Sequence, residues 1–214
     1  MQCFSPAEPL SGEYKTILDN APDGVVLIAF GSTINLATLP PEIKSSFLNM
    51  MRRFPKVLFI WRWDGPEPED QPKNLIVSKW LPQLQILGHP NLRAFISHAG
   101  LNSLSEATYH GVPVILIPIF GDQDYNGYRV EATEIGIRLE LKHLNSEILS
   151  TSLNQVLHNP KYSTNMKAMS ALFRDRPMSP IETDVQDTIE IQIFGRAPVQ
   201  DCLWELYAPI FGRR

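Results

Sequence analysis

Six short apolar segments in the first two thirds of the chain constrain its fold more than any other feature. They are rich in valine, isoleucine and phenylalanine, and their apolar residues are nearly continuous rather than alternating with polar ones. Continuous apolar runs of this kind are typical of strands buried on both faces, which is the environment of a parallel sheet. The segments cover residues 24–30, 56–63, 74–80, 92–98, 112–119 and 135–141.

Helical patterns lie between several of these segments. Pro40 and Pro41 stand where a first helical turn would begin, and Pro55 ends that pattern. A shorter helix is predicted over 101–110, closed by Gly111. After the last segment the pattern is wholly helical, with two apolar stripes that we interpret as core: Leu149, Leu153, Val156, Leu157, and then Met166, Met169, Phe173. This alternation predicts an α/β fold, a Rossmann-like parallel sheet with helices on both faces.

Charge and cysteine content exclude several classes of protein. The 214 residues carry 19 Lys and Arg against 23 Asp and Glu, a net charge of -4, without a basic run, so a nucleic-acid partner is not expected. Cys3 and Cys202 are too far apart in the sequence to indicate a disulfide framework or a zinc site. The length suits one domain or slightly more.

Targeting and membrane signals are also not apparent. The longest apolar runs, 24–30 and 112–120, are much shorter than the ~20 residues that a membrane-spanning helix needs. The N-terminal residues have neither the basic region nor the apolar region of a signal peptide. Taken by itself, the sequence therefore predicts neither export nor a membrane anchor.

Ligands of a doubly wound sheet bind at the carboxyl ends of its strands, so the residues after each strand are the candidate site. The first strand runs into Phe30, Gly31 and Ser32, a small turn whose backbone N–H groups could approach an anion. It is neither a G-x-G-x-x-G dinucleotide motif nor a P-loop with its lysine, so an oxidoreductase that binds a dinucleotide is disfavoured. Taken alone, Gly31-Ser32 is more typical of a plain turn than of an anion site.

The fourth strand runs directly into a helix through a tight turn. Backbone donors and the helix dipole favour a phosphate there, and His98, Gly100, Asn102 and Ser103 supply the turn and further polar groups. An alternative is structural: Ser103 and Glu106 also fit a capping box, and Asn102 could be the cap instead. Taken alone, His98 is also compatible with a satisfied core or turn histidine.

The fifth strand is followed by Asp122, Gln123 and Asp124. Adjacent carboxylate and amide groups suit a polyhydroxylated ligand, because each can bridge two hydroxyls. Alternatively, Asp122 or Asp124 caps the next helix. A metal site is less favoured, since no histidine or further carboxylate is clustered with them.

The third strand ends at Trp80, with Gln83 shortly after it. An indole at that edge can stack on a flat base, and an amide can bond to a base edge. The alternative is that Trp80 is a core aromatic. Residues that could bind a base, a phosphate and a sugar thus follow the third, fourth and fifth strands in turn. The sequence contains no competing catalytic motif: no G-x-S-x-G, no H-E-x-x-H and no C-x-x-C.

Residues 80–126, WLPQLQILGHPNLRAFISHAGLNSLSEATYHGVPVILIPIFGDQDYN, resemble the donor-binding signature of the UDP-glycosyltransferases, of the animal UDP-glucuronosyltransferase type. Three further segments support the resemblance, which extends to about Pro180: VVLIAFGS (25–32), VLFIWRWDG (57–65) and CFSPAEPL (3–10). It implies the C-terminal domain of a GT-B glycosyltransferase, an inverting enzyme without a metal or other cofactor. The donor would be a UDP-sugar, and the activity glucuronosyl or glucosyl transfer to small lipophilic acceptors.

The resemblance also implies a role for each motif residue. Trp80 would stack on uracil, and Gln83 would bond to the base or ribose, with Arg62 lining the base pocket. Glu106 would hold the ribose hydroxyls. Asp122 and Gln123 would hold the sugar hydroxyls. The diphosphate would be held by residues near the start of the helix, with Ser32 facing it. These residues are His98, Gly100, Asn102 and Ser103.

Three departures from the family pattern shape the expectations. The acceptor-binding half with its catalytic histidine would precede this chain, so no catalytic residue is predicted here. A separate N-terminal half or a full-length relative is an expected partner, and a non-catalytic isoform or subunit is the alternative function. Ala99 replaces a family glycine, and alanine is tolerable there if the residue keeps a negative φ. The tail differs, so the predicted parts are a linker-like segment 1–20, the donor domain 21–180 and a divergent tail 181–214. The resemblance implies a location at the endoplasmic reticulum membrane.

Overall fold

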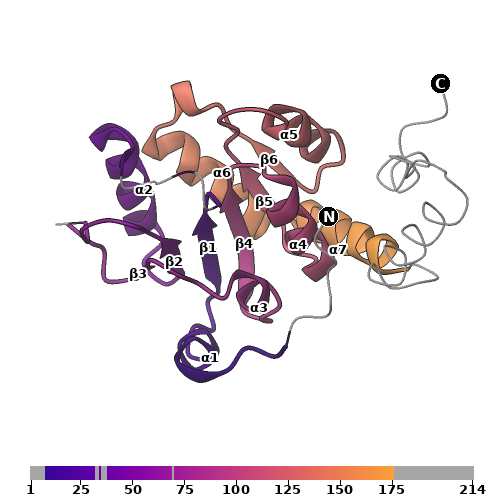
Figure 1. The fold of residues 1–214 in the computed structure, drawn as a ribbon, viewed down its shortest axis with the longest axis horizontal. Helices are drawn as coiled ribbons and strands as arrows, with labels where there is room; N and C mark the ends of the chain where they lie inside the picture. Colours follow the sequence, from indigo (N-terminus) through magenta and orange to yellow (C-terminus); the bar gives the residue numbers. More distant parts are fainter. Residues whose placement is uncertain (1–7, 32–33, 35–37, 69, 176–214) are drawn as a thin grey trace, which may run out of the picture. The chain divides into compact units, whose positions relative to one another are not determined.

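The computed structural model contains a six-stranded parallel sheet (Figure 1). It describes residues 8–31, 34, 38–68 and 70–175. Each of the six predicted segments contains one strand, shorter than the segment itself. The strands are β1 Val25–Ala29, β2 Leu58–Arg62, β3 Leu75–Ser78, β4 Leu92–Ser97, β5 Val114–Leu116 and β6 Gly136–Arg138. The predicted parallel α/β fold is therefore confirmed.

The strand order, β3-β2-β1-β4-β5-β6, reverses direction between β1 and β4. These two neighbours are aligned up to their last residues, where Ala29 lies opposite Ser97. A doubly wound sheet binds ligands at such a switch point, outside the carboxyl ends of the strands. The topology therefore places the ends of β1 and β4 at the centre of the candidate site.

One face of the sheet is covered by α2 (Pro41–Arg53) and α6 (Ser146–His158), which contact each other. Side chains of successive strand residues point to opposite faces, and the core on this side takes every second one, including Val26 and Ile28 of β1. From the helices it takes Phe47, Met50 and Leu149, among others. Pro40 and Pro41 stand at the start of α2, as the sequence predicts.

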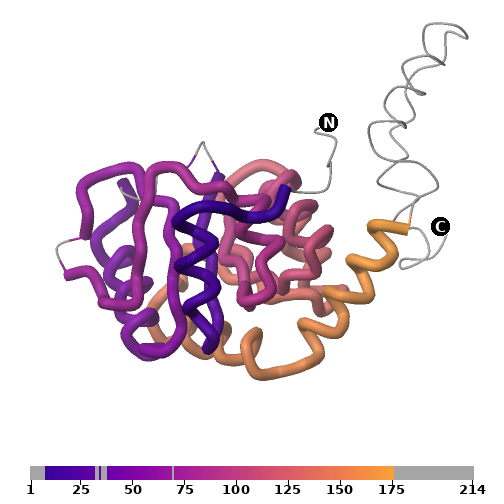
Figure 2. The backbone as a smooth tube through the Cα atoms, turned by 90° about the horizontal axis from the view of Figure 1, so that it is seen from below, coloured from indigo at the N-terminus to yellow at the C-terminus, as the bar shows by residue number. Residues whose placement is uncertain are grey.

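The remaining helices are α3 (Gln83–Leu87), α4 (Leu101–His110), α5 (Gln123–Ala132), α7 (Pro160–Arg174) and the short α1 (Gly12–Asp19). Figure 2 shows helices on both sides of the sheet. α4 ends at Gly111 in the left-handed conformation, as predicted. Ala7–Ala171 form one unit, and within it the Ser170 hydroxyl of α7 donates to the Tyr109 carbonyl of α4 at 2.6 Å. Met166 and Met169 are buried, which confirms the core interpretation.

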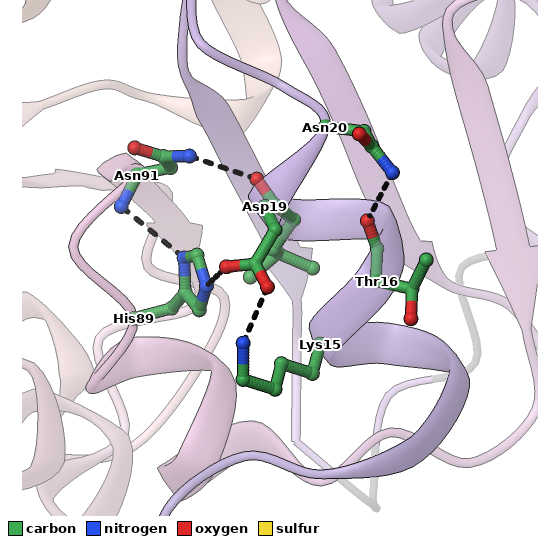
Figure 3. A network of polar contacts seen from close by, with 7 residues as sticks. Lys15, Thr16, Asp19, Asn20, His89 and Asn91 are labelled. Carbon is green, nitrogen blue, oxygen red and sulfur yellow. Dashed lines mark hydrogen bonds and ion pairs between the residues drawn. The ribbon is translucent and has the colours of Figure 1, made fainter.

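Helix α1 lies inside the segment 1–20, whose composition predicted only a linker-like stretch. Its last turn is tied to the turn before β4 by a polar network (Figure 3). Asp19 accepts hydrogen bonds from Lys15 and from His89 Nε2, the latter at 3.1 Å. The N–H of Asn91 donates to His89 Nδ1, and the Asn91 amide donates to the Leu18 carbonyl. His89 is thereby held as the tautomer that carries its proton on Nε2.

Because of this network, replacing Asp19 by asparagine is expected to lower stability at neutral pH. The hydrogen bond from Lys15, and then that from His89, hold the pKa of Asp19 below its ordinary value of 3.8. A carboxylate with a depressed pKa contributes stability above its unfolded pKa and loses it as pH falls through the folded pKa. Urea unfolding should therefore separate the wild type from D19N at pH 7, and the difference should vanish as the pH is lowered past 3.8.

Asp23→Asn is the matched control, since Asp23 lies in the same connection and outside the network. A D19N deficit that is unchanged at low pH would contradict an ionic role for Asp19.

Candidate functional site

The predicted site residues lie at one edge of the sheet, because the parallel strands all end there (Figure 1). Gly31 follows β1, Trp80 follows β3 and His98 follows β4. Asp122 and Gln123 lie after β5, at the start of α5. The remaining first-strand candidate, Ser32, lies outside the described residues. Asn102, Ser103 and Glu106 are on α4, whose first residue follows Gly100.

The imidazole of His98 is buried in a cradle of backbone and aromatic groups. It stacks on Phe30, with ring centroids 6.4 Å apart and an interplanar angle of 29°. A Cβ at Gly31 would come within 2.9 Å of its Cε1, and a Cβ at Gly100 within 2.5 Å of its Nε2. Only glycine therefore leaves room for the ring on these two sides. Nε2 is directed to the start of α4, and Nδ1 lies 3.3 Å from the Ser97 hydroxyl.

Burial makes the neutral form of His98 the stable one. Desolvation lowers its pKa below the ordinary value of 6.5, and the carboxylate of Asp122 opposes that shift. A neutral imidazole whose Nε2 carries the proton can donate one hydrogen bond toward the N-terminus of α4. That end of the helix also presents free backbone N–H groups and the positive end of the helix dipole. The arrangement suits an anion.

Two side chains of α4, those of Ser103 and Glu106, bond to Gln83 at the start of α3. The Gln83 amide nitrogen donates to Glu106 Oε2 at 2.6 Å and to the Ser103 hydroxyl at 3.2 Å. Gly100 is the N-cap residue and no side chain caps the helix. The capping-box alternative for Ser103 and Glu106 is therefore wrong. The alternative that Asn102 is the cap is wrong too, since Asn102 is the second residue of α4 and is exposed.

Glu106 is half-buried, and its environment acts on its charge in two directions. Burial raises its pKa above the ordinary value of 4.5, and the hydrogen bond from Gln83 lowers it. Burial is the larger effect. A carboxylate placed in this way has acceptor capacity beyond its bond to Gln83, which is the chemistry needed to hold vicinal hydroxyl groups.

Two residues close the turn between β5 and α5. Gln123 is buried, and its side-chain oxygen accepts hydrogen bonds from the backbone N–H groups of Ile119 at 2.8 Å and Phe120 at 3.1 Å. Asp122 occupies the N-cap position of α5 but makes no capping bond. Its carboxylate instead accepts from the Asn126 amide at 3.0 Å. The alternative that Asp122 caps the helix through its side chain is therefore wrong.

Asn126 connects this turn to the one that follows β4. The same amide nitrogen that bonds to Asp122 donates to the Ala99 carbonyl at 3.0 Å. Sequence reasoning did not single out Asn126. Its spacing of four residues from Asp122 could have indicated that contact, because residues four apart are neighbours on a helix. Nothing in the sequence indicated the contact with Ala99.

Ala99 departs from the sequence-based expectation of a negative φ. Its φ is 68°, in the left-handed region, where a family glycine would stand without strain. A side-chain-bearing residue there costs about 1–2 kcal/mol. The bond from Asn126 and the complete burial of Ala99 hold it in place.

Trp80 is open to solvent, with 77% of its surface exposed, so the core alternative is wrong. Its carbonyl accepts from the Ser78 hydroxyl, which orders the backbone beneath the ring. An exposed indole on an ordered turn is a free stacking surface. Arg62, which the resemblance assigned to the base pocket, donates a hydrogen bond to the Gly31 carbonyl.

Two kinds of feature are not found in the part of the chain that the structure describes. Among those residues, no three His, Cys, Asp or Glu side chains gather in a way that could hold a metal ion. Over the same residues, none of the helices is long and apolar enough to cross a membrane.

Comparison with known proteins identifies similar chains. A sequence profile described as "UDP-glucoronosyl and UDP-glucosyl transferase" matches residues 1–189. A UDP-glycosyltransferase (UGT5) of Dactylopius coccus is 39% identical over 168 residues, which are 78% of this chain and 32% of that protein. The 2-hydroxyacylsphingosine 1-beta-galactosyltransferase of Homo sapiens is 36% identical over 181 residues, 84% of this chain and 33% of that protein. The chain thus spans about a third of the length of these relatives.

The fold is also found in solved structures. A UDP-glucose:anthocyanidin 3-O-glucosyltransferase in complex with UDP matches with a TM-score of 0.72 and 24% identity, over 88% of this chain and 44% of that one. At this identity the similarity concerns the fold.

Proposed function

Because this chain belongs to the UDP-glucuronosyl and UDP-glucosyl transferase family, we propose that it is the donor-binding module of a UDP-sugar-dependent glycosyltransferase. The observation that carries the proposal is the ordered set of polar and aromatic side chains at the carboxyl ends of β3, β4 and β5. They present a free indole, a hydroxyl-binding carboxylate, an anion site and a second carboxylate. A nucleotide-sugar carries the matching groups in the same order.

The nucleoside end would lie over α3 and the first turns of α4. Trp80 would stack on uracil, and Gln83 would bond to the base or ribose while it holds Glu106 toward the ribose hydroxyls. The bond from Gln83 to Ser103 leaves the backbone amide of Ser103 for the ligand. The diphosphate would be held by donors at the start of α4, with Ser32 facing them: His98, Gly100, Asn102 and Ser103.

The sugar end would lie over the turn that precedes α5. Asp122 is exposed and can accept sugar hydroxyls while it is bonded to Asn126. The side-chain oxygen of Gln123 is already occupied by two backbone N–H groups, so its amide nitrogen is the group left for the ligand. Asp122 and Gln123 thus offer two side chains at one turn that can bind the hydroxyls of a hexosyl group.

In this proposal the acceptor site and the catalytic base belong to an N-terminal half. That half would be a separate chain or part of a full-length relative. That partner would bring the small lipophilic acceptor and the attachment to the endoplasmic reticulum membrane. His98 is not assigned as that base, because its ring is fixed in a cradle at the anion site. Donor binding is expected without a metal or other cofactor.

Isothermal titration of the 214-residue chain with UDP tests the proposal directly. UDP should bind, NAD should bind more weakly, and EDTA should leave the affinity for UDP unchanged. No UDP binding at millimolar concentrations, or tighter binding of NAD than of UDP, would overturn it. Adding a relative's N-terminal half with a UDP-sugar and a phenolic acceptor then tests transfer, with turnover expected only in the mixture.

The raised pKa of Glu106 leads to a pH prediction. If the ribose is held by the ionised carboxylate, affinity is full above the pKa of Glu106 and falls as the pH drops through it. Because burial raises that pKa, the fall should begin above 4.5. Glu106→Gln should bind more weakly at neutral pH and lack this acidic fall.

UDP-glucose is the ligand to titrate in this experiment, because a terminal phosphate itself ionises near pH ~6. Glu13→Gln, at an exposed position of helix α1, is the control. An acidic fall that persists unchanged in E106Q would show that another group is responsible.

A further inference from the structure

Arg138, at the end of β6, contacts the first two turns of α5. Its guanidinium donates to Asp124 Oδ1 at 2.8 Å and lies over the Tyr128 ring, 4.3 Å from its centroid. A second carboxylate, that of Glu140, is 3.7 Å away. The Arg138 side chain is only 13% exposed, whereas Asp124 is 60% exposed. The contact thus joins a largely buried guanidinium, stacked on an aromatic ring, to an exposed carboxylate, and it links one strand end to one helix start.

The aliphatic part of Arg138 is packed as closely as its charged end. A Cβ at Gly127 would come within 2.9 Å of Arg138 Cδ and 3.1 Å of Pro118 Cγ. Glycine at 127 therefore lets α5 approach both the arginine stem and the end of β5. Gly127 and Tyr128 lie three and four residues after Asp124, so Arg138 contacts a single face of α5.

On the side that faces Arg138, the start of α5 borders open space. A cavity of about 260 Å³ lies beside Arg138, lined also by Pro118, Asp124, Leu139, Glu140, Leu141 and Lys142. Beside a cavity, a helix turn lacks packing partners and can shift. The ion pair to Arg138 is therefore the contact that fixes Asp124 on this side.

The fixed turn is the one proposed to hold the sugar. Asp124 directly follows Asp122 and Gln123, and Pro118 directly precedes the two amides that bind Gln123. Because Asp124 is the next residue along the chain, the placement of its backbone bears on both hydroxyl-binding side chains. Gln83 and Glu106, by contrast, lie on α3 and α4 and have no bond to Arg138 among the described residues.

We propose that Arg138 is a positioning residue for the donor sugar: its ion pair with Asp124 and its stacking on Tyr128 set the placement of Asp122 and Gln123. The inference rests on the proposed function. It predicts that Arg138 acts on recognition of the hexosyl group and leaves recognition of the nucleotide unchanged. It also predicts that Arg138 and Asp124 act as one unit.

The test compares the dissociation constants of UDP and UDP-glucose, measured by calorimetry on the full chain. Arg138→Met keeps the length of the side chain and removes the charge. We expect this change to weaken the binding of UDP-glucose by about 2- to 30-fold, the range for residues that act through a neighbour. The dissociation constant of UDP should be unchanged. Arg138→Lys should restore part of the loss. Asp124→Asn should reproduce it, and the double variant should be no worse than either single one.

Lys161→Met is the matched control, because Lys161 also pairs with a carboxylate, Glu134, at 2.8 Å and lies 5.0 Å from the centroid of the Tyr162 ring. It should change neither constant. Unchanged UDP-glucose affinity in R138M, or equal weakening of both ligands, would overturn the inference. If R138M does not fold, the dissociation constants of UDP and UDP-glucose in R138K and D124N provide the same test. Failure of the wild type to bind UDP would instead overturn the proposed function.

Discussion

Replacing Trp80 by alanine is expected to weaken UDP binding by about 5- to 150-fold without loss of stability. Stacking of a base on an aromatic side chain contributes about 1–3 kcal/mol, and each 1.36 kcal/mol corresponds to about a factor of ten. The indole is 77% exposed, so its removal leaves no cavity. Calorimetric titration gives the binding constant, and urea unfolding gives the stability.

Trp80→Phe should retain most of the affinity, because it keeps an aromatic face. Tyr125→Ala is the control for the loss of an exposed ring at another place, since Tyr125 is 64% exposed. It should leave UDP binding as it is. Equal affinities of W80A and the wild type would remove Trp80 from the proposed site.

Replacing Gly100 by alanine is expected to reduce both stability and UDP affinity. The backbone of Gly100, with φ -63° and ψ 135°, accepts any residue, so the effect comes from contact alone. The new Cβ would lie 2.5 Å from Nε2 and 2.7 Å from Cε1 of His98. Phe30 and Gly31 block the ring on other sides. Forcing an extra methyl into such a site costs about 1–3 kcal/mol.

A double-mutant cycle separates this contact from other effects. In a His98→Ala background the ring is gone, so G100A should cost little, and the two changes should be strongly non-additive. UDP affinity should fall in G100A because Nε2 is displaced from the start of α4. Additive losses of stability would show that the cradle does not restrain the ring.

The fold was predictable because its signals are local. Each buried strand is a continuous apolar run bounded by turn residues, and the parallel arrangement follows from burial of both faces. Once the strands are parallel, residues such as His98 and Gln123 must meet at one edge, whatever their separation in the sequence. The position of these residues at the site therefore follows from the apolar pattern of the strands and from the parallel topology of the sheet.

The conformations inside the site were not predictable in this way. Ala99 adopts a positive φ because Asn126, 27 residues away in the sequence, donates to its carbonyl. Ser103 and Glu106 fit a capping box by spacing, but Gln83 from another strand end competes for both side chains. In each case a tertiary partner decides, and the spacing of residues carries no information about it.

Helix α1 shows the same limit. It has only eight residues, of which Leu18 alone is buried, so its apolar pattern is too short to distinguish it from a loop. An isolated helix of this length is unstable in water. Its partners are residues of the turn before β4, Asn91 and His89, and they supply what the local sequence lacks.

The cradle around His98 has a consequence for the thermodynamics of binding. Its ring is immobilised before any ligand arrives, so it forms a hydrogen bond without the entropy loss of about 0.5–1.5 kcal/mol that ordering a mobile side chain entails. The exposed ring of Trp80 has no such restraint and must give up its rotational freedom when a base covers it. One ligand thus meets a preorganised donor at one end and a side chain that is ordered only on association at the other.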